Sequence, residues 1–544
     1  MIEFDPVLVH DWLSRSARRF PDKTALVCDK QRWTYKAIDK RTTHLANALM
    51  DAGVRRQDRV VVLLDNSAET VISLYGILKA GGVFVILAGS IKGAKLRYIL
   101  KNSDATVLIT HTGKSKVVED ALSEGGINCR TIWVGQTESI PEKYSASSLS
   151  WDNIFADYSD QAPDNEKRRR LPRCIDVDLA TLIYTSGSTG EPKGVMSTHH
   201  NMISAARSII QYIDNVEDDI ILDVLPLSFD YGLYQIIMSV MFGGTVVLER
   251  SFLYLHSVLE RISQEKVTGF PIVPTIVAML LKQQDLSKYD FSTVRYMTNT
   301  GAALPVEHIR KLRKLLPNVT IISMFGLTEC KRVGYLPPEE LDRRPSSVGK
   351  AMPNCETFVV DEDGNEVAPG KTGELVIRGS NVMQGYWKDP EITARAYRNR
   401  RYPSERLLYS GDNFRQDEEG FLYFLGRKDD MIKSKGERIS AKEVENIICG
   451  MEGVSEAAVL GLPDEILGQA IKAYIVSAPG VELSEKPVLK YCSENMEVFM
   501  VPKYIEFMES LPKTPNGKID KKQLKSKEEH AEILGSPTVN AVEK

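Results

Sequence analysis

A segment with hydroxyls, glycines and one lysine, TLIYTSGSTGEPKGVMSTHHN from Thr181 to Asn201, has the residue types that bind phosphate. Its first four residues are apolar and β-prone, which is typical of the end of a buried strand. The glycines that follow let the backbone turn its N–H groups inward around an anion, while hydroxyls and Lys193 add donors and charge. The segment is not a Walker A loop, because Gly194 follows Lys193 where that motif needs Ser or Thr. The alternative is a solvated serine–glycine loop; as a phosphate loop it would use Thr185, Ser186, Gly187, Ser188, Thr189, Gly190 and Lys193.

Two further segments carry side chains suited to a nucleotide. SMFGLTE, which ends at Glu329, follows an expected strand and offers Phe325 for stacking on a base and a carboxylate for a divalent cation. LLYSGDN places Asp412 at a turn, where its carboxylate could accept hydrogen bonds from two vicinal ribose hydroxyls. Each segment alone is weak, since a carboxylate after a turn is usually a cap or a surface charge.

Two more segments lie near the C-terminus. GRKDDMIKSKGERIS runs from Gly426 to Ser440, and LPKTPNGKID places Lys518 after Pro515, Asn516 and Gly517. By itself Lys518 would be interpreted as an exposed turn lysine, because those three residues favour a turn. The five segments together, in this order, are a much more specific signal than any one of them.

The elements that must position these segments alternate between short apolar runs and longer amphipathic stretches from about Thr24 to Gly426. Such alternation predicts α/β layers with mostly parallel sheets. We expect strands at Arg59–Leu64, Thr106–Thr110, Thr131–Val134, Ile220–Val224, Gly244–Leu248 and Thr320–Met324, and helices at Ser67–Ala80, Asn201–Tyr212, Ser257–Glu265 and Val306–Leu315.

A smaller unit with its own pattern follows Gly426. We expect helices at Lys442–Cys449 and Val488–Asn495 and strands at Val454–Gly461, Ala470–Ser477 and Tyr504–Met508, which predicts a compact α+β domain. The expected division is therefore a domain over residues 1–425, a domain over 426–525, and a polar tail over 526–544 that frays.

Composition limits the class of protein. The chain has 544 residues, 43% hydrophobic and 26% charged, with a net charge of −4 and scattered Lys and Arg, so no nucleic-acid-binding face is expected. No run of about 18 apolar residues is present, so no membrane span is expected, and Glu3 and Asp5 argue against a signal peptide. Seven cysteines without a C-x-x-C pair argue against a disulfide framework and a zinc site. We therefore predict a reduced, cytoplasmic enzyme.

Taken together, the five segments resemble the superfamily of AMP-forming adenylating enzymes, which includes acyl-CoA synthetases, luciferases and the adenylation domains of nonribosomal peptide synthetases. The resemblance extends from LKAGGVFVIL, which begins at Leu78, to Lys518. It implies an α/β fold with a large N-terminal domain of layered subdomains and a small, mobile α+β C-terminal domain. It also implies that a substrate carboxylate attacks the α-phosphate of ATP and that a thiol then displaces AMP. ATP, Mg²⁺ and the phosphopantetheine of coenzyme A or of a carrier protein would take part.

The resemblance also implies a role for individual residues. Lys518 would bridge the carboxylate and the phosphate during adenylation, as a cation that stabilises developing negative charge. Thr328 would contact phosphate, Glu329 would bind Mg²⁺, and Asp412 would hold the ribose hydroxyls with help from Arg427. The adenine would lie between Phe325, followed by Gly326, and a wall formed by Gly301, Ala302 and Ala303. The pivot for rotation of the small domain would be Asp429, and the thiol tunnel would be lined by Gly436 and Arg438.

The resemblance also implies which residues form the pocket for the acid. By resemblance it would be lined by Phe229, Asp230, Tyr231, Tyr234, Pro271, Thr298, Thr300, Met324, Arg332 and Val333. Many acyl- and aryl-CoA ligases carry a histidine near the position of Asp230, whereas amino-acid-activating domains carry an aspartate that pairs with the substrate's ammonium. Asp230 could instead cap the helix that follows it, or pair with Arg332. The two tyrosines favour a short or compact acid.

Three hypotheses follow for the function. The first is an acyl-CoA or acyl-carrier-protein ligase for a carboxylic acid without an amino group. The second is a free-standing adenylation enzyme for a compact amino acid such as proline, which would load a separate carrier protein. The third is a non-catalytic paralogue, which would predict damage to the motifs; the mapped positions instead all hold chemically competent residues.

Overall fold

The computed structural model describes most of the chain. The described residues are 5–136, 148–156, 171–186, 191–283, 286–302, 304–399, 402, 405–428, 432–434, 437–464, 468–514 and 517–533. Several residues singled out above lie outside these ranges, namely Gly187, Ser188, Thr189, Gly190, Ala303, Asp429 and Gly436.

The first sheet is built from short apolar segments of the N-terminal part, in the order β7-β6-β5-β3-β4-β8-β9. Its strands are β3 (Arg59–Leu63), β4 (Val83–Ile86), β5 (Ala105–His111), β6 (Arg130–Val134), β7 (Ser148–Ser150), β8 (Leu179–Ser186) and β9 (Pro192–Thr198). All neighbours pair in parallel except β8 and β9, which form an antiparallel hairpin. Continuous buried runs such as VVVL in β3 are typical of parallel strands covered by helices.

The second sheet has the order β16-β15-β14-β13-β12-β10-β11-β1-β2. Its strands are β1 (Thr24–Cys28), β2 (Gln31–Thr34), β10 (Ile220–Asp223), β11 (Thr245–Leu248), β12 (Gly269–Ile272), β13 (Tyr296–Asn299), β14 (Thr320–Phe325), β15 (Gly334–Tyr335) and β16 (Lys350–Ala351). The neighbouring strands β14, β13, β12, β10, β11 and β1 run parallel, so the carboxyl ends of β10, β12, β13 and β14 meet at one edge. In open α/β sheets this edge is where ligands bind.

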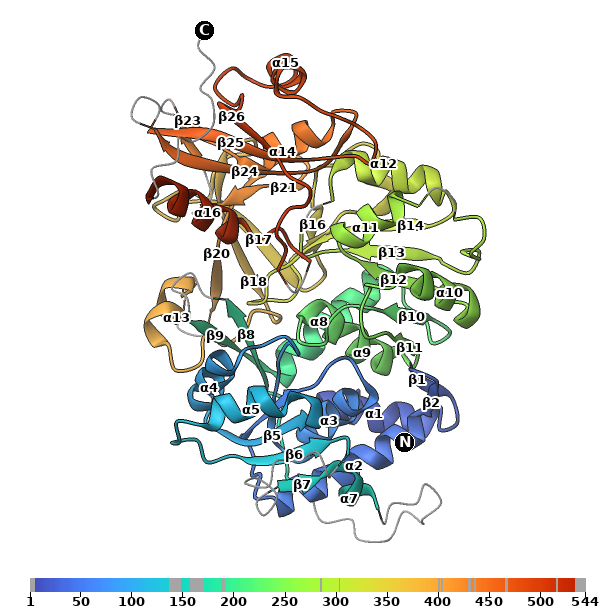
Figure 1. Cartoon of the computed structure of the whole chain (residues 1–544). Coiled ribbons are helices and arrows are strands. Elements are labelled where there is room, and N and C mark those ends of the chain that lie inside the picture. Colours follow the sequence, from blue (N-terminus) through green and yellow to red (C-terminus); the bar gives the residue numbers. More distant parts are fainter. Residues whose placement is uncertain are drawn as a thin grey trace.

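Helices cover and separate these two sheets. They are α1 (Val9–Arg19), α2 (Tyr35–Asp51), α3 (Ala68–Lys79), α4 (Gly93–Asn102), α5 (Ser115–Leu122), α7 (Trp151–Phe155), α8 (His199–Ile213), α9 (Asp230–Phe242), α10 (Leu255–Glu265), α11 (Pro274–Leu281), α12 (Val306–Leu315) and α13 (Pro390–Ala396). Figure 1 shows α8 and α9 in the middle of the molecule, between the two sheets. α9 is buried almost all round, as a helix apolar on every face must be. Among the described helices none is long and apolar enough to cross a membrane.

A third, antiparallel sheet has the order β17-β18-β20-β19, with β21 paired to β20. Its strands are β17 (Cys355–Val360), β18 (Thr372–Gly379), β19 (Tyr397–Arg398), β20 (Leu407–Gln416) and β21 (Leu422–Arg427). Its core includes Leu375, Phe414 and Leu422, together with Cys330 and Val333 from the turn after β14. The sheet therefore packs directly against the turn that carries Thr328 and Glu329.

The C-terminal unit forms its own sheet and core. Its elements are β22 (Ile432–Ser434), β23 (Glu437–Ile439), α14 (Ala441–Cys449), β24 (Val454–Asp464), β25 (Gly468–Ser477), α15 (Glu485–Asn495), β26 (Tyr504–Phe507) and α16 (Lys521–Ile533). Val444, Val459 and Ile475 belong to a core separate from that of the large unit. The predicted fold class, a large α/β unit followed by a small α+β unit, is confirmed.

The end of the chain differs from the sequence-based expectation, which was fraying beyond Leu524. Helix α16 continues to Ile533, because a buried carboxylate holds it against the sheet. Glu528 accepts hydrogen bonds from Lys472 Nζ at 2.7 Å and from the hydroxyl of Tyr474 at 2.6 Å. Residues 534–544 lie outside the described ranges.

Candidate active site

The proposed phosphate loop is the tip of the β8–β9 hairpin. Thr185 pairs with Lys193 and Ser186 pairs with Pro192 in the antiparallel register. Directly opposed residues of an antiparallel pair project to the same face, so Thr185 and Lys193 can act on one ligand. The tip itself, residues 187–190, is outside the described residues.

The segment 383–387 ties this hairpin to Glu329. Trp387 N donates to Gly194 O at 2.7 Å, and Met383 N donates to Glu329 O at 3.0 Å. Between these bonds the hydroxyl of Tyr386 donates to Glu329 Oε1 at 2.8 Å, and Lys193 Nζ lies 5.9 Å from the centre of the Tyr386 ring. The phosphate hairpin and the candidate metal carboxylate therefore share one support.

Tyr386 stays a hydrogen-bond donor to Glu329. Burial raises the pKa of Tyr386 well above its usual value, and the neighbouring Glu329 raises it further. The described residues contain no cluster of three or more His, Cys, Asp or Glu side chains that could hold a metal. A cation here would use Glu329 together with ligand oxygens, which is how Mg²⁺ usually binds with a substrate polyphosphate.

The turn from Gly326 to Val333 joins β14 to β15 and is held tightly. A Cβ at Gly326 would overlap the carbonyl oxygen of Lys331, so only glycine allows the two arms to approach this closely. Arg332 N donates to Cys330 O at 2.8 Å, which closes a three-residue turn around Lys331. Lys331 has a φ of 65°, an unfavourable conformation for a residue with a Cβ.

Asn381 fixes this turn from the third sheet. Its Nδ2 donates to Cys330 O at 2.9 Å and to Arg332 O at 2.8 Å, and its side chain is fully buried. The two carbonyls flank Lys331, so Asn381 compensates the strain at that residue with two hydrogen bonds.

The candidate ribose carboxylate lies on β20, opposite β21. Asp412 is buried, and its Oδ1 lies 3.4 Å from Nε of Arg427, its cross-strand partner. Phe325 contacts this sheet through Phe414, edge to face at 5.0 Å, and through Phe424 at 5.9 Å. A ring stacked on Phe325 would therefore lie near the Asp412 carboxylate.

Lys518 reaches this region from the C-terminal unit. Its Nζ lies 5.6 Å from the centre of the Phe229 ring, and its Cε would be 3.5 Å from a Cβ built at Gly301. Thr514 N donates to Lys518 O at 2.7 Å, which closes the turn that presents the side chain. Lys518 is exposed, yet surrounding protein lowers its pKa by desolvation, an effect partly opposed by Asp230.

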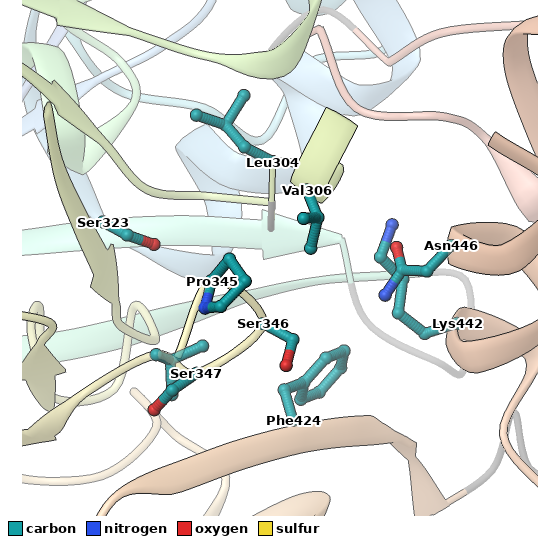
Figure 2. A pocket seen from close by; sticks show the side chains of 10 residues that line it. Leu304, Val306, Ser323, Pro345, Ser346, Ser347, Phe424, Lys442 and Asn446 are labelled. Atoms are coloured by element: carbon teal, nitrogen blue, oxygen red, sulfur yellow. The ribbon is translucent and has the colours of Figure 1, made fainter. Parts of the chain in front are cut away.

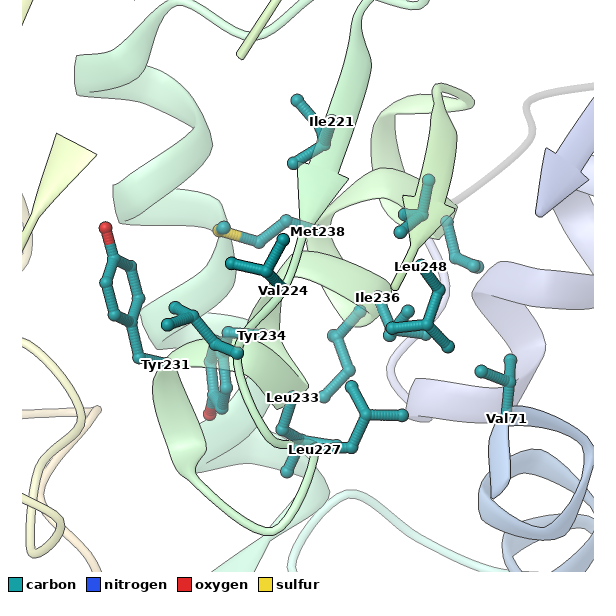
Figure 3. Close-up of a cluster of buried hydrophobic side chains, with 14 of the residues drawn as sticks. Val71, Ile221, Val224, Leu227, Tyr231, Leu233, Tyr234, Ile236, Met238 and Leu248 are labelled. Atoms are coloured by element: carbon teal, nitrogen blue, oxygen red, sulfur yellow. The ribbon is translucent and has the colours of Figure 1, made fainter. Parts of the chain in front are cut away.

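Three residues from the first turns of α9 face the turn at Lys331. The hydroxyl of Tyr231 lies 2.7 Å from both the carbonyl and the hydroxyl oxygen of Thr298. Figure 3 shows Tyr231 and Tyr234 on one side of a buried apolar cluster, with Leu233 and Ile236 between them and Val71. Lys331 Nζ lies 3.9 Å from Oδ2 of Asp230 and 5.2 Å from the centre of the Tyr234 ring. Arg332 lies over the Tyr231 ring at 5.2 Å.

Lys331 is a buried cation in this pocket. Its side chain is 2% exposed, and burial lowers its pKa to about 8, although Asp230 opposes the shift. Among the described residues its Nζ has no hydrogen-bond partner. The amino group of Lys331 is therefore a buried polar group whose hydrogen-bonding capacity is not satisfied within the described part of the chain.

Comparison with known proteins places these features in one family. Residues 13–387 match the model of the AMP-binding enzymes, and residues 443–518 match the model of the AMP-binding enzyme C-terminal domain. The chain belongs to the AMP-binding enzyme family. It is an AMP-forming enzyme of the acid–CoA ligase type, as the resemblance predicted.

Relatives of this AMP-binding enzyme match it over nearly its whole length. The long-chain-fatty-acid–CoA ligase of Bacillus subtilis (strain 168) is 31% identical and covers 95% of this chain and 94% of its own. The indoleacetate–CoA ligase of Aromatoleum aromaticum is 29% identical, and the match covers 94% of this chain and 96% of that ligase. Among solved structures, the anthranilate CoA ligase AuaEII in complex with anthranoyl-AMP is 28% identical, with a TM-score of 0.87. The match covers 97% of this chain and 99% of that structure's chain.

Two interpretations of Asp230 do not hold in this AMP-binding enzyme. Asp230 is the first residue of α9 rather than its cap, since the capping position is Phe229 and no side chain caps there. Its ion-pair partner is Lys331, whereas Arg332 lies against Tyr231. Val333 is also displaced from the expected acid pocket, because its side chain packs into the core of the third sheet.

The other predicted pocket residues of this AMP-binding enzyme are buried around the same region. Thr298 lies on β13, Thr300 directly follows that strand, and Pro271 lies on β12. Met324 on β14 accepts a hydrogen bond from the hydroxyl of Tyr212 at 2.9 Å. Ala302 O accepts from Asn299 Nδ2 at 3.0 Å, next to Gly301, whose φ of 85° requires glycine.

Sequence reasoning missed Lys331, Tyr386 and Asn381. For Lys331 a signal was present, since this lysine lies between Glu329 and Arg332, two residues already assigned to the site. Tyr386 and Asn381 had no such signal, because both act through contacts with residues distant in the sequence.

A narrow cleft separates the two units of this AMP-binding enzyme. Figure 2 shows Lys442 and Asn446 of α14 facing Val306, Ser346 and Phe424 across it. Lys442 Nζ lies 3.5 Å from Oε2 of Glu445, so its charge is partly engaged within its own helix. Arg438 lies on the neighbouring strand β23.

The hydrogen bonds of Asn381 lead to a stability prediction. Asn381→Ala should lower the free energy of unfolding by about 2–4 kcal/mol, because two buried hydrogen bonds to backbone carbonyls are lost. Denaturant unfolding of the purified protein measures this change. Asn495→Ala is the control, since Asn495 donates only to Tyr491 O on an exposed helix face and should change stability by less than about 0.5 kcal/mol. Equal effects of the two substitutions would contradict the assigned role of Asn381.

Proposed function

We propose that the protein activates a compact carboxylic acid with ATP and transfers the acyl group to the thiol of coenzyme A. The observation that carries this proposal is the position of Lys518 beside Phe229 and Gly301, at the edge where the parallel strands of the second sheet end. A cation at this edge is suited to a reaction that brings a carboxylate to a polyphosphate. The charged groups that act on Lys518 are Asp230, Arg427, Asp412 and Glu329.

In the proposed first step a carboxylate oxygen attacks the α-phosphorus of ATP. A new P–O bond forms, and the bond to the bridging oxygen breaks, so that the electron pair leaves with pyrophosphate. Lys518 donates to the carboxylate and to an α-phosphoryl oxygen and stabilises the charge that develops there. Thr185, Lys193 and Thr328 hold the leaving phosphates, while Asp412 holds the ribose.

Glu329 fits the role of a magnesium ligand in this step. It offers one carboxylate beside the phosphate hairpin, and Tyr386 fixes the position of Oε1. Mg²⁺ bound to a nucleotide commonly uses one or two carboxylates along with phosphate oxygens and water. When bound, the ion would supply neutralisation of phosphate charge.

In the proposed second step the thiol attacks the carbonyl carbon of the acyl adenylate. A C–S bond forms, the C–O bond to AMP breaks, and the thiol proton passes to solvent. By resemblance to the family, residues 426–525 move as a unit about Asp429, relative to residues 1–425, and withdraw Lys518. Gly436 and Arg438 would then line the path of the pantetheine arm. A carrier protein bearing phosphopantetheine is the other acceptor of the same chemistry.

Substrate-dependent exchange of labelled pyrophosphate into ATP tests this function. The panel contains short, medium and long fatty acids, aromatic acids, and amino acids with their desamino analogues. We expect exchange with compact acids and little with long chains, because Tyr231 and Tyr234 are buried at the pocket and polar groups face it. The names of two relatives also refer to compact acids, indoleacetate and anthranilate. No exchange with any acid would refute the proposal.

A second candidate function is the activation of a compact amino acid for a separate carrier protein. Asp230 favours it, because its carboxylate does not cap α9 and could face an ammonium group. Exchange confined to one amino acid, and lost with its desamino analogue, would support this candidate over the first.

A further inference from the structure

Lys331 combines two unfavourable features that core packing alone does not explain. Its ammonium group is buried without a hydrogen-bond partner among the described residues, and the 3.9 Å to Asp230 exceeds a hydrogen bond. A buried cation without full compensation is unfavourable, whereas an apolar side chain could fill the same space.

The backbone at Lys331 is also strained, and the protein maintains this strain. The φ of 65° is sparsely populated for lysine, and Asn381 stabilises the carbonyls on both sides of it. Strain held in this way concentrates at ligand-binding and active sites. The turn thus directs a lysine toward α9, where Asp230 and Tyr234 lie.

Unpaired donors indicate what is missing from the pocket. Lys331 Nζ has no hydrogen-bond partner among the described residues, and the carboxylates that act on it are those of Asp230 and Glu329. Arg332 likewise has a buried Nε without a hydrogen-bond partner in the described part of the chain. An anionic oxygen group of the ligand could accept hydrogen bonds from both donors, whereas an ammonium group has no lone pair with which to accept them.

We propose that Lys331, with Arg332, binds a second anionic oxygen group of the acid, so that the substrate is a short dicarboxylic acid. This inference rests on the proposed function, because the reacting carboxylate is assigned to Lys518. Lys518 lies against Phe229, the residue before Asp230, and Lys331 lies against Asp230 itself. The two carboxylates would therefore bind on either side of the start of α9, which requires a short spacer.

Matched pairs of acids test the proposal. Pyrophosphate exchange is measured with succinate against butyrate and with glutarate against valerate, which differ by the second carboxylate. We expect the wild-type enzyme to prefer the diacid of each pair. In Lys331→Met the ratio of kcat/KM for diacid to monoacid should fall by about 30-fold or more, mainly through the KM of the diacid. Lys331→Arg, which keeps the charge, should retain part of the preference.

The control for this substitution is Lys350→Met. Lys350 lies on β16, exposed, over the Phe421 ring at 4.4 Å, and should leave the ratio unchanged. AMP binding and thermal unfolding establish that each variant is folded. If Lys331→Met does not fold, the wild-type preference and the Lys331→Arg variant still decide the question.

The outcomes separate this inference from the proposed function. Exchange that is equal within each pair, and equal again in Lys331→Met, would overturn the role of Lys331 while acid activation stands. Exchange confined to one amino acid would also overturn it. Absence of exchange with every acid would refute the proposed function itself, and this inference with it.

Discussion

Lys518→Ala is expected to lower the rate of acyl-adenylate formation by about 100- to 1,000-fold. The side chain is the cation that reaches the large unit from the C-terminal turn, beside Phe229 and Gly301. Without it, negative charge that develops as the carboxylate meets the α-phosphate has no compensating donor at this point. Single-turnover formation of AMP-linked product from ATP and acid measures the effect directly.

The same variant should still form thioester when a prepared acyl adenylate and coenzyme A are supplied, because that step does not require the lysine at the phosphate. Lys513→Ala is the matched control. Lys513 lies in the same C-terminal segment, and its Nζ pairs with Glu456 Oε1 at 2.8 Å. Adenylation at the wild-type rate in Lys518→Ala, or equal losses in both variants, would contradict the assignment.

Asp412→Ala is expected to raise the KM for ATP by at least about 100-fold, because a hydrogen bond to a charged group contributes about 1.5–3 kcal/mol and two ribose hydroxyls lose their acceptor. The carboxylate is buried on β20, next to Arg427 and close to the aromatic residues that contact Phe325. Pyrophosphate exchange at varied ATP concentration gives this KM.

Two comparisons make the Asp412 experiment specific. Asp412→Asn keeps the shape of the side chain, and its KM for ATP should lie between those of the wild type and the alanine variant. Glu418→Ala removes an exposed carboxylate from the turn after β20 and should leave the KM for ATP unchanged. A normal KM in Asp412→Ala, with the protein folded by thermal unfolding, would remove Asp412 from the nucleotide site.

The elements predicted from local patterns agree with the structure within a few residues. The apolar run expected at Arg59–Leu64 is β3 (Arg59–Leu63), and the helix expected at Val306–Leu315 is α12 over the same residues. These elements could be recognised from local patterns. A strand buried on both faces of its sheet needs a continuous apolar stretch, and an amphipathic helix needs apolar residues that recur about every 3.6 positions. The extent of α16 could not be recognised in this way, because Leu524 and Glu528 hold it through contacts with residues distant in the sequence.

The acid pocket was less accessible to sequence reasoning than the nucleotide site. The nucleotide motifs keep their functional residues within a few positions, as in the turn that carries Thr328 and Glu329. The pocket instead combines α9 with a turn from the other end of the sheet. Asp230 could thus be placed at the start of a helix, but its ion-pair partner, Lys331, could not be identified from the residues next to it in the sequence.

The sequence by itself determined the family, the two-part α/β architecture and the order of the motifs, because these depend on local composition and on spacing along the chain. Only the tertiary structure decided that Lys331 rather than Arg332 faces Asp230, that Val333 turns into the third sheet, and that Tyr386 joins Lys193 to Glu329. The physical reason is that a side chain's direction at a tight turn depends on a single backbone angle. At Lys331 that angle is held by Asn381, fifty residues away along the chain.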